Sequence, residues 1–303
     1  MHIRLLCRFS LSLLLITLIS FPVRAQSVKG RIERIKSIES RYAAQRITEV
    51  WLPEGYDPAR NKYCVVYMHD GQNLFDSTFS YGGKEWKVDE TLTDLRKNGL
   101  IKDCIVVAIW NTPLRFLEYA PQKPFGLMNG TSVREIRNEA NYGGSPLSDD
   151  YLKFIVLELK PYIDKHYATL TGPEGTFISG SSMGGLISLY ALTEYPEVFG
   201  GAACISTHWP LRLQNNSQAF TNASIEYLSA RLDNLSNKKF YFDYGTETLD
   251  AWYEVHQVRI DSLFRAKGFT ESNFLSIKFP GHAHNEASWA ERFHIPAAFL
   301  LKP

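Results

Sequence analysis

Apolar residues along this chain follow two different spacings. Residues 63–68 and 104–110 are almost continuously apolar, which is typical of strands covered on both faces. Further strand-like runs occupy residues 29–51, 175–179, 201–205, 239–244 and 274–279. Apolar residues recur at helical spacing within 86–95, 148–163, 186–195, 251–267 and 287–301. Strands that alternate with helices predict an α/β fold with a mostly parallel central sheet and helices on both faces.

This rhythm breaks at residues 111–148, after the fourth predicted strand. The segment is rich in Pro, Gly and Asn and shows no periodicity, but it contains aromatic residues, Tyr119 among them. A connection of this length is usually either a functional lid or disordered. The aromatic content favours an ordered, lid-like loop.

The N-terminus has the pattern of a secretory signal peptide. Arg4 and Arg8 precede an apolar run from Leu11 to Phe21, and the polar residues that follow Ala25 suit the start of a mature protein. The run is short for a membrane span, although an uncleaved anchor is the alternative. We therefore expect residues 1–25 to be a signal peptide and residues 26–303 to form one exported domain, periplasmic or secreted and with no membrane contact after cleavage.

Charge and cysteine content narrow the possible partners. The net charge of the 303 residues is +1, so nothing in the electrostatics favours nucleic acid. Cleavage would leave three cysteines, all within apolar, strand-like runs, which indicates buried thiols. Cys64 and Cys104 could still form a disulfide in an oxidising compartment.

Candidate chemistry centres on Gly180-Ser181-Ser182-Met183-Gly184, a Gly-x-Ser-x-Gly sequence. A strand-like run precedes it and a helical pattern follows it. This is the context of a nucleophile elbow, in which a sharp turn exposes the serine and small neighbours make room for the turn. The alternative is an ordinary Gly/Ser-rich loop. We expect Ser182 to be a nucleophile, with the Met183 N–H as one oxyanion donor and Gln72, after an earlier strand, as the other.

A serine nucleophile needs a base and an acid, which follow it in the order Ser, acid, His in such folds. His282 and His284, after the last strand, are the candidate bases. With Glu286 they could instead ligate a metal, but no second cluster of matching spacing supports this, and we expect neither metal nor cofactor. Glu247 and Asp250 are the candidate acids. Asp250 is preferred because backbone N–H groups at the start of the next helix can hold its carboxylate.

Three sequences together resemble the putative esterase family of α/β-hydrolases: residues 67–72, residues 180–185, and Gly281-His282-Ala283-His284 with Trp289 five residues on. The resemblance implies the α/β-hydrolase fold, Ser182 as nucleophile, His284 as base, and Gln72 and Met183 as oxyanion donors. The acid departs from the family pattern, because Thr248 occupies the usual place of an Asp. Asp250 lies two residues on.

The family includes feruloyl esterases, enterochelin esterases and mycolyltransferases, so the resemblance suggests the substrate class. We expect a serine carboxylesterase acting on a carbohydrate-linked acyl or feruloyl ester. Trp209 and Tyr119 could stack on a substrate ring, or they could only pack the loops. The alternatives are a siderophore esterase, an acyltransferase to a sugar or lipid alcohol, and a non-catalytic binding module. The sequence does not fix the oligomeric state.

Overall fold

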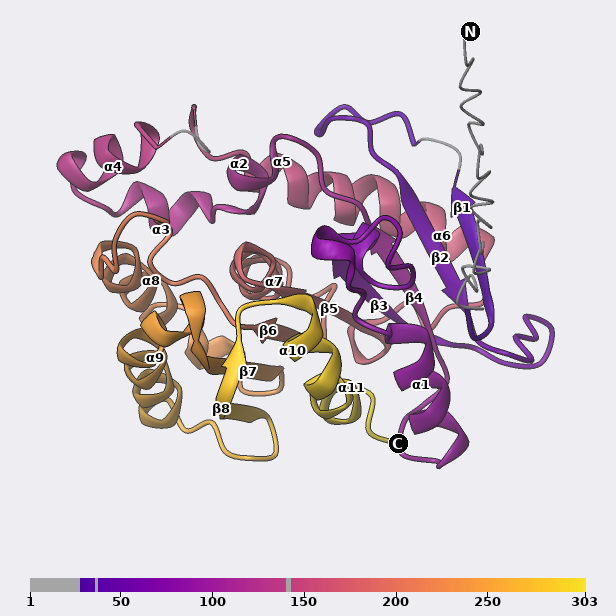
Figure 1. Ribbon diagram of the computed structural model, residues 1–303. Coiled ribbons are helices and arrows are strands. Elements are labelled where there is room, and N and C mark those ends of the chain that lie inside the picture. The colour runs from indigo at the N-terminus through magenta and orange to yellow at the C-terminus, as the bar shows by residue number, and fades with distance from the viewer. Residues whose placement is uncertain (1–27, 36–37, 140–142) are drawn as a thin grey trace, which may run out of the picture.

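An eight-stranded sheet is the framework of the computed structural model, which describes residues 28–35, 38–139 and 143–303 (Figure 1). The strands are β1 (Arg31–Ile35), β2 (Thr48–Leu52), β3 (Cys64–His69), β4 (Cys104–Ile109), β5 (Thr176–Ser181), β6 (Gly201–Ile205), β7 (Lys239–Glu247) and β8 (Phe274–Ala283). Their spatial order is β1-β2-β4-β3-β5-β6-β7-β8. The pairs β1–β2 and β2–β4 are antiparallel, and the other five pairings are parallel, which confirms the predicted mostly parallel sheet.

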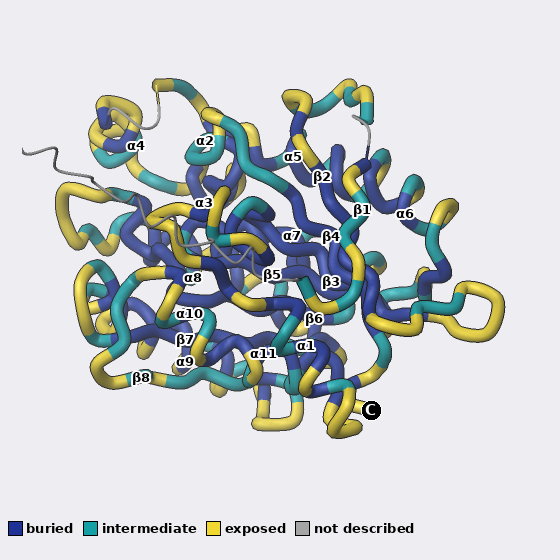
Figure 2. The backbone as a smooth tube through the Cα atoms, turned by 45° about the vertical axis from the view of Figure 1, so that its right-hand side comes forward, coloured by how far each residue is buried: buried dark blue, intermediate teal, exposed yellow. Residues whose placement is uncertain are grey.

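Alternate residues of the central strands enter two separate cores, one on each face of the sheet. In β3, Val65 and Tyr67 belong to one core, while Val66 and Met68 belong to the other. This follows from the period of two along a strand. Figure 2 shows the buried strands running through the middle of the molecule. Both faces need covering, which is why these strands are apolar at nearly every position.

Helices cover both faces, as predicted. The α-helices are α1 (Val88–Lys97), α2 (Arg115–Tyr119), α3 (Gln122–Gly126), α4 (Gly130–Arg137), α5 (Ser148–Lys153), α6 (Lys160–His166), α7 (Met183–Glu194), α8 (Ala219–Ser229), α9 (Glu254–Ala266), α10 (Glu286–Arg292) and α11 (His294–Leu300). A π-helical segment, residues 154–159, joins α5 to α6. The predicted helix at 287–301 is two helices. Pro296 has no N–H to donate to the Arg292 carbonyl, and the break falls between them at Phe293.

Residues 111–148 are more regular than their composition suggests. They hold α2, α3 and α4, each too short to show a periodic pattern in the sequence. A buried ion pair anchors α2, because Arg46 donates to both carboxylate oxygens of Glu118 at 3.0 and 2.5 Å. Removing one partner of such a pair typically costs about 3–5 kcal/mol. The part of the segment that follows β4 and contains α2 is therefore held in place.

Two further expectations concern the signal peptide and the cysteines. The predicted signal peptide, residues 1–25, lies outside the described residues, and no described helix is long and apolar enough to cross a membrane. Cys64 and Cys104 are register partners on β3 and β4, but both are buried free thiols, as is Cys204. The predicted buried thiols are thus what the structure shows, and not the disulfide.

Candidate active site

Ser182 occupies a strained turn between β5 and α7. Its backbone has φ 59° and ψ −120°, a combination that non-glycine residues rarely adopt, and its N–H donates to the Ile205 carbonyl at 2.9 Å. The turn is tight enough that a Cβ on Gly180 would lie 2.8 Å from the Gly184 carbonyl oxygen. This strand, tight turn and helix have the geometry of the predicted elbow, and the close approach explains the glycine at position 180.

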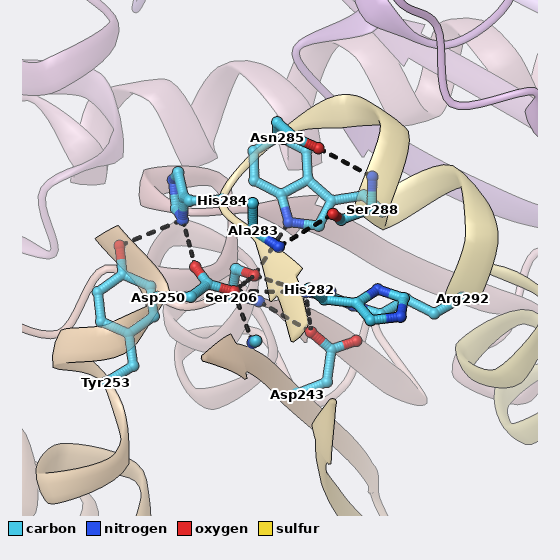
Figure 3. Close-up of polar contacts among 12 residues, drawn as sticks. Ser206, Asp243, Asp250, Tyr253, His282, Ala283, His284, Asn285, Ser288 and Arg292 are labelled. Atoms are coloured by element: carbon cyan, nitrogen blue, oxygen red, sulfur yellow. Dashed lines mark hydrogen bonds and ion pairs between the residues drawn. The ribbon is translucent and has the colours of Figure 1, made fainter. Parts of the chain in front are cut away.

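His284 follows β8 and meets a buried carboxylate from the loop after β7. Its Nδ1 lies 2.5 Å from Oδ1 of Asp250, whose side chain has no solvent exposure (Figure 3). The His284 N–H donates to Thr248 Oγ1 at 2.8 Å, which fixes the backbone beside the ring. Glu247, the other candidate acid, is exposed at the end of β7. Of the two acids, Asp250 is the one in contact with His284.

The second carboxylate oxygen of Asp250 is also fully engaged. Ser206 Oγ and the Gly245 N–H each donate to Oδ2 at 2.6 Å. Burial alone would raise the pKa of Asp250, but the hydrogen bonds from His284, Ser206 and Gly245 hold that pKa below its ordinary value. The Asp250 carboxylate is therefore ionised at neutral pH.

Behind Asp250 lies a buried cation. Arg292 donates from Nη2 to Ser206 Oγ at 2.6 Å and to Asp243 Oδ1 at 3.0 Å, and this nitrogen lies 3.6 Å from Asp250 Oδ2. The Trp289 indole N–H donates to the same Ser206 oxygen at 2.9 Å. One guanidinium thus supports two buried carboxylates, since an unpaired buried charge costs several kcal/mol.

Tyr253 connects the serine to the histidine side of the site. Its hydroxyl lies 3.4 Å from Nδ1 of His284 and 2.8 Å from Nδ1 of His208, and it forms a hydrogen bond with the Ser182 side chain. Burial raises the pKa of Tyr253 well above its usual value, so the phenol stays neutral. Sequence reasoning passed over this residue, because nothing in a lone Tyr within a helical pattern marks it as a neighbour of a serine.

His282 points away from His284, although the two are only two residues apart. Its Nε2 lies 3.8 Å from a carboxylate oxygen of Glu291, and Figure 3 shows the two rings on opposite sides. Within the part of the chain that the structure describes, no group of three His, Cys, Asp or Glu side chains is arranged to hold a metal ion. The alternative of a metal site at His282, His284 and Glu286 therefore has no geometric support.

The two predicted oxyanion donors lie in the turn after β3 and at the start of α7. A cleft of about 460 Å³ is lined by Ser182, His284 and Gln72, among others. Gln72 belongs to a 3-10 turn, Gly71–Asn73, directly after β3, and Met183 is the first residue of α7. Arg115 braces this turn with two hydrogen bonds of 2.7 Å to Asp70. Ser182 and the turn that carries Gln72 therefore line the same cleft.

Both aromatic residues predicted to bind substrate are buried, so that prediction is wrong. Trp209 is fully buried against Phe242, and its indole N–H donates to Gln257 at 2.8 Å. Tyr119 is fully buried against His69 and Tyr151, with ring centroids 5.1 and 5.3 Å apart. Both residues therefore fit the alternative, in which they only pack the loops. Burying a large aromatic ring removes much apolar surface from water and so stabilises the fold. The cleft is lined instead by Tyr81, Phe116 and Trp289.

Comparison with known proteins shows which family the chain belongs to. Residues 41–294 match the family model described as "Putative esterase". The chain belongs to this esterase family. An uncharacterized protein YbbA from Bacillus subtilis (strain 168) is 24% identical to this esterase over 270 residues, covering 85% of this chain and 93% of that protein.

Two solved structures share the esterase's fold. A ferulic acid esterase superposes with a TM-score of 0.65 at 17% identity, over 91% of this chain and 99% of that chain. The enterobactin esterase FES from Shigella flexneri gives a TM-score of 0.64 at 17% identity, over 91% of this chain and 60% of that chain. These likenesses confirm the α/β-hydrolase fold.

Ser206 and Arg292 are members of the esterase's site that sequence reasoning missed. Ser206 directly follows β6, and side chains after neighbouring parallel strands meet at one sheet edge, so its place was a usable signal. The sequence held no such signal for Arg292, because a basic residue at a helix C-terminus is normally exposed to solvent.

The Ser206 hydroxyl should contribute more to the free energy of unfolding than the hydroxyl of an exposed serine does. Replacing Ser206 with Ala leaves Asp250 Oδ2, the Trp289 N–H and Arg292 each short of one buried partner, and an unsatisfied buried group costs about 1–3 kcal/mol. We expect Ser206→Ala to lower the free energy of unfolding by about 3 kcal/mol in urea titration. The exposed Ser236 is the control, and Ser236→Ala should cost less than about 0.5 kcal/mol. Equal costs for the two variants would contradict the network described above.

Proposed function

We propose that this esterase is a serine carboxylesterase that cleaves its substrate through an acyl-enzyme on Ser182. The observation that carries the proposal is the 2.5 Å contact between His284 and the buried Asp250, at a cleft that Ser182 also lines. An ionised acid, an imidazole and a serine in that sequence form the arrangement that turns a weakly nucleophilic hydroxyl into a nucleophile.

In the proposed reaction Ser182 Oγ attacks the ester carbonyl carbon while His284 Nε2 takes the hydroxyl proton. Asp250 keeps the imidazole in the tautomer whose Nδ1–H points at the carboxylate, and it stabilises the imidazolium that forms. The carbonyl oxygen, now negative, accepts hydrogen bonds from the N–H groups of Met183 and Gln72. Because α7 begins directly after the serine, its positive end adds to this stabilisation.

The second half of the reaction returns the enzyme to its starting state. The tetrahedral intermediate collapses with cleavage of the bond to the alcohol oxygen, which receives the proton from His284 Nε2. Water then attacks the acyl carbon and gives a proton to the same nitrogen. Cleavage of the bond to Ser182 Oγ releases the carboxylic acid and the proton returns to the serine.

The substrate proposed first is a carbohydrate-linked acyl or feruloyl ester. A relative by fold is named a ferulic acid esterase, and the cleft is lined by the exposed ring of Tyr81 and by Phe116, which could contact a flat acyl group. A siderophore ester is the second candidate, since another relative by fold is named an enterobactin esterase. The signal-like residues 1–25 support export of a single mature domain to the periplasm or the outside of the cell.

Ser182 should be the residue that a fluorophosphonate probe labels. The probe reacts with serines that a neighbouring base activates, and Ser182 is the serine at the elbow. Ser182→Ala should lose labelling, whereas replacement of the adjacent Ser181, which ends β5, should leave it in place. Labelled peptides are identified by mass spectrometry. A Ser182→Ala protein that is folded and still labelled would refute the proposed nucleophile.

Amide substitutions separate the two candidate acids, because an amide keeps the shape of the side chain and removes its charge. Asp250→Asn should lower kcat by about ten-thousandfold, the loss seen when a triad acid is neutralised elsewhere. Glu247→Gln should change kcat less than about twofold, since Glu247 is exposed. Initial rates on a chromogenic acetyl ester measure both. An inactive Glu247→Gln protein alongside an active Asp250→Asn protein would reverse the assignment.

A further inference from the structure

Most of the side chains that line the cleft beside Ser182 and His284 are polar or charged. Apart from Tyr81, Phe116 and Trp289, all the described side chains that line it are polar or charged. A cleft that takes a long aliphatic chain is lined mainly by apolar side chains. This cleft instead suits a substrate part with a flat or ring-shaped body and several hydrogen-bonding groups at its edge.

Glu286 stands out among these polar residues because it is almost fully buried and yet lines the cleft. It begins α10, two residues after His284, and its relative exposure is 7%. The Asn73 side chain donates to its Oε1 at 3.3 Å, so the carboxyl group is held against the turn that carries Gln72. No step of the proposed hydrolysis uses this carboxyl group.

The protonation of Glu286 fits a hydrogen-bonding role toward a neutral ligand. Burial raises its pKa to about 7, with Asp70 adding to the rise and Arg115 opposing it. Near neutral pH the group is therefore present in two forms, one that only accepts hydrogen bonds and one that also donates. A hydroxyl group can be recognised by either form, because it is itself both donor and acceptor.

The nearby cation does not make the cleft a site for anions. Arg115 directs two of its N–H groups to the Asp70 carboxylate, which also accepts from the Asn111 side chain at 2.6 Å. That pairing brings its own negative charge, and Glu286 adds a further acid. Neutral hydroxyl groups are thus the substrate groups that this lining accommodates best.

We propose that Glu286 is a specificity-determining residue, which binds hydroxyl groups on a ring of the substrate while Ser182 attacks the ester. The inference rests on the proposed function, because it places the hydroxylated ring at the same cleft as the acyl-enzyme. It goes beyond that function by assigning recognition of the ring's hydroxyl groups to Glu286. Such hydroxyls can belong to a catechol on the acyl side or to a sugar on the alcohol side.

Two pairs of esters separate these sources. Methyl 3,4-dihydroxycinnamate and methyl cinnamate differ only in the acyl hydroxyls. The 5-O-benzoyl ester of methyl arabinofuranoside and tetrahydrofurfuryl benzoate differ in the substituents of the alcohol ring, chiefly its hydroxyls. We expect the protein to favour the hydroxylated member of one pair by about tenfold in kcat/KM, the effect of one or two neutral hydrogen bonds. The pair that shows the preference identifies the source.

Three variants assign the preference to Glu286. Glu286→Leu should abolish it, while Glu286→Gln, which still donates and accepts, should keep it to within about threefold. Glu291→Leu is the matched control, since Glu291 lies on the same helix with a side chain that is 71% exposed and outside the cleft, and it should change nothing. Fluorophosphonate labelling of Glu286→Leu verifies that its active site is intact. The proposal is overturned if the protein hydrolyses the two members of each pair equally well, or if labelled Glu286→Leu keeps the preference.

Calorimetric binding of the same esters to Ser182→Ala protein keeps the two proposals distinguishable. Tighter binding of a hydroxylated ester that is lost on adding Glu286→Leu supports the subsite even if the unmodified enzyme hydrolyses none of the esters. That outcome would refute the serine esterase and not the subsite. Hydrolysis of both members of each pair at equal rates, with equal binding, would refute the subsite and not the esterase.

Discussion

The buried carboxylate of Asp250 is the constraint on which the geometry of the active site depends. Its two oxygens accept hydrogen bonds from His284 after β8, from Ser206 after β6 and from Gly245 within β7. An ionised group without exposure is tolerated only when it is fully paired, so these three strands must end in fixed positions relative to one another. Arg292 extends the requirement to α10. The same contacts therefore stabilise the fold and orient the His284 imidazole.

Backbone strain gathers at the same edge of the sheet. Six non-glycine residues with positive φ occur among the described residues. Four of them directly follow the C-terminal ends of parallel strands: Asp70 after β3, Ser182 after β5, Ser206 after β6 and Thr248 after β7. Such conformations cost about 1–3 kcal/mol each and persist where the surroundings hold them. The Asp70 side chain is bound by Arg115, and the Ser206 N–H donates to the Asp243 carbonyl. Two of these residues, Asp70 and Ser182, line the same cleft.

Much of the frame could be predicted from the sequence, because its signals are local. The continuous apolar runs gave the buried strands, and the glycines around Ser182 gave the elbow, since only a tight turn requires them. His284 and Asp250 could be nominated because each follows a late strand, where the chain order of the fold places a base and an acid. Their contact, and the exposure of Glu247, required the structure.

The features that could not be predicted depend on tertiary packing. Trp209 lies in the loop after β6 and Tyr119 ends α2, but whether each ring faces the cleft or the core is decided by neighbours distant in the chain, such as Gln257 and Tyr151. The helices within 111–148 are too short to leave a periodic pattern. The role of Arg292 could not be predicted either, because its partners Ser206, Asp243 and Asp250 come from other parts of the chain.

The most direct test of this account is a crystal structure of the esterase after reaction with a phosphonate ester, whose tetrahedral phosphorus imitates the intermediate. The account predicts phosphorus bonded to Ser182 Oγ, with the phosphonyl oxygen within about 3 Å of the backbone nitrogens of both Met183 and Gln72. His284 should still contact Asp250 in that adduct. Phosphorus on another residue, or a phosphonyl oxygen turned away from both nitrogens, would contradict it.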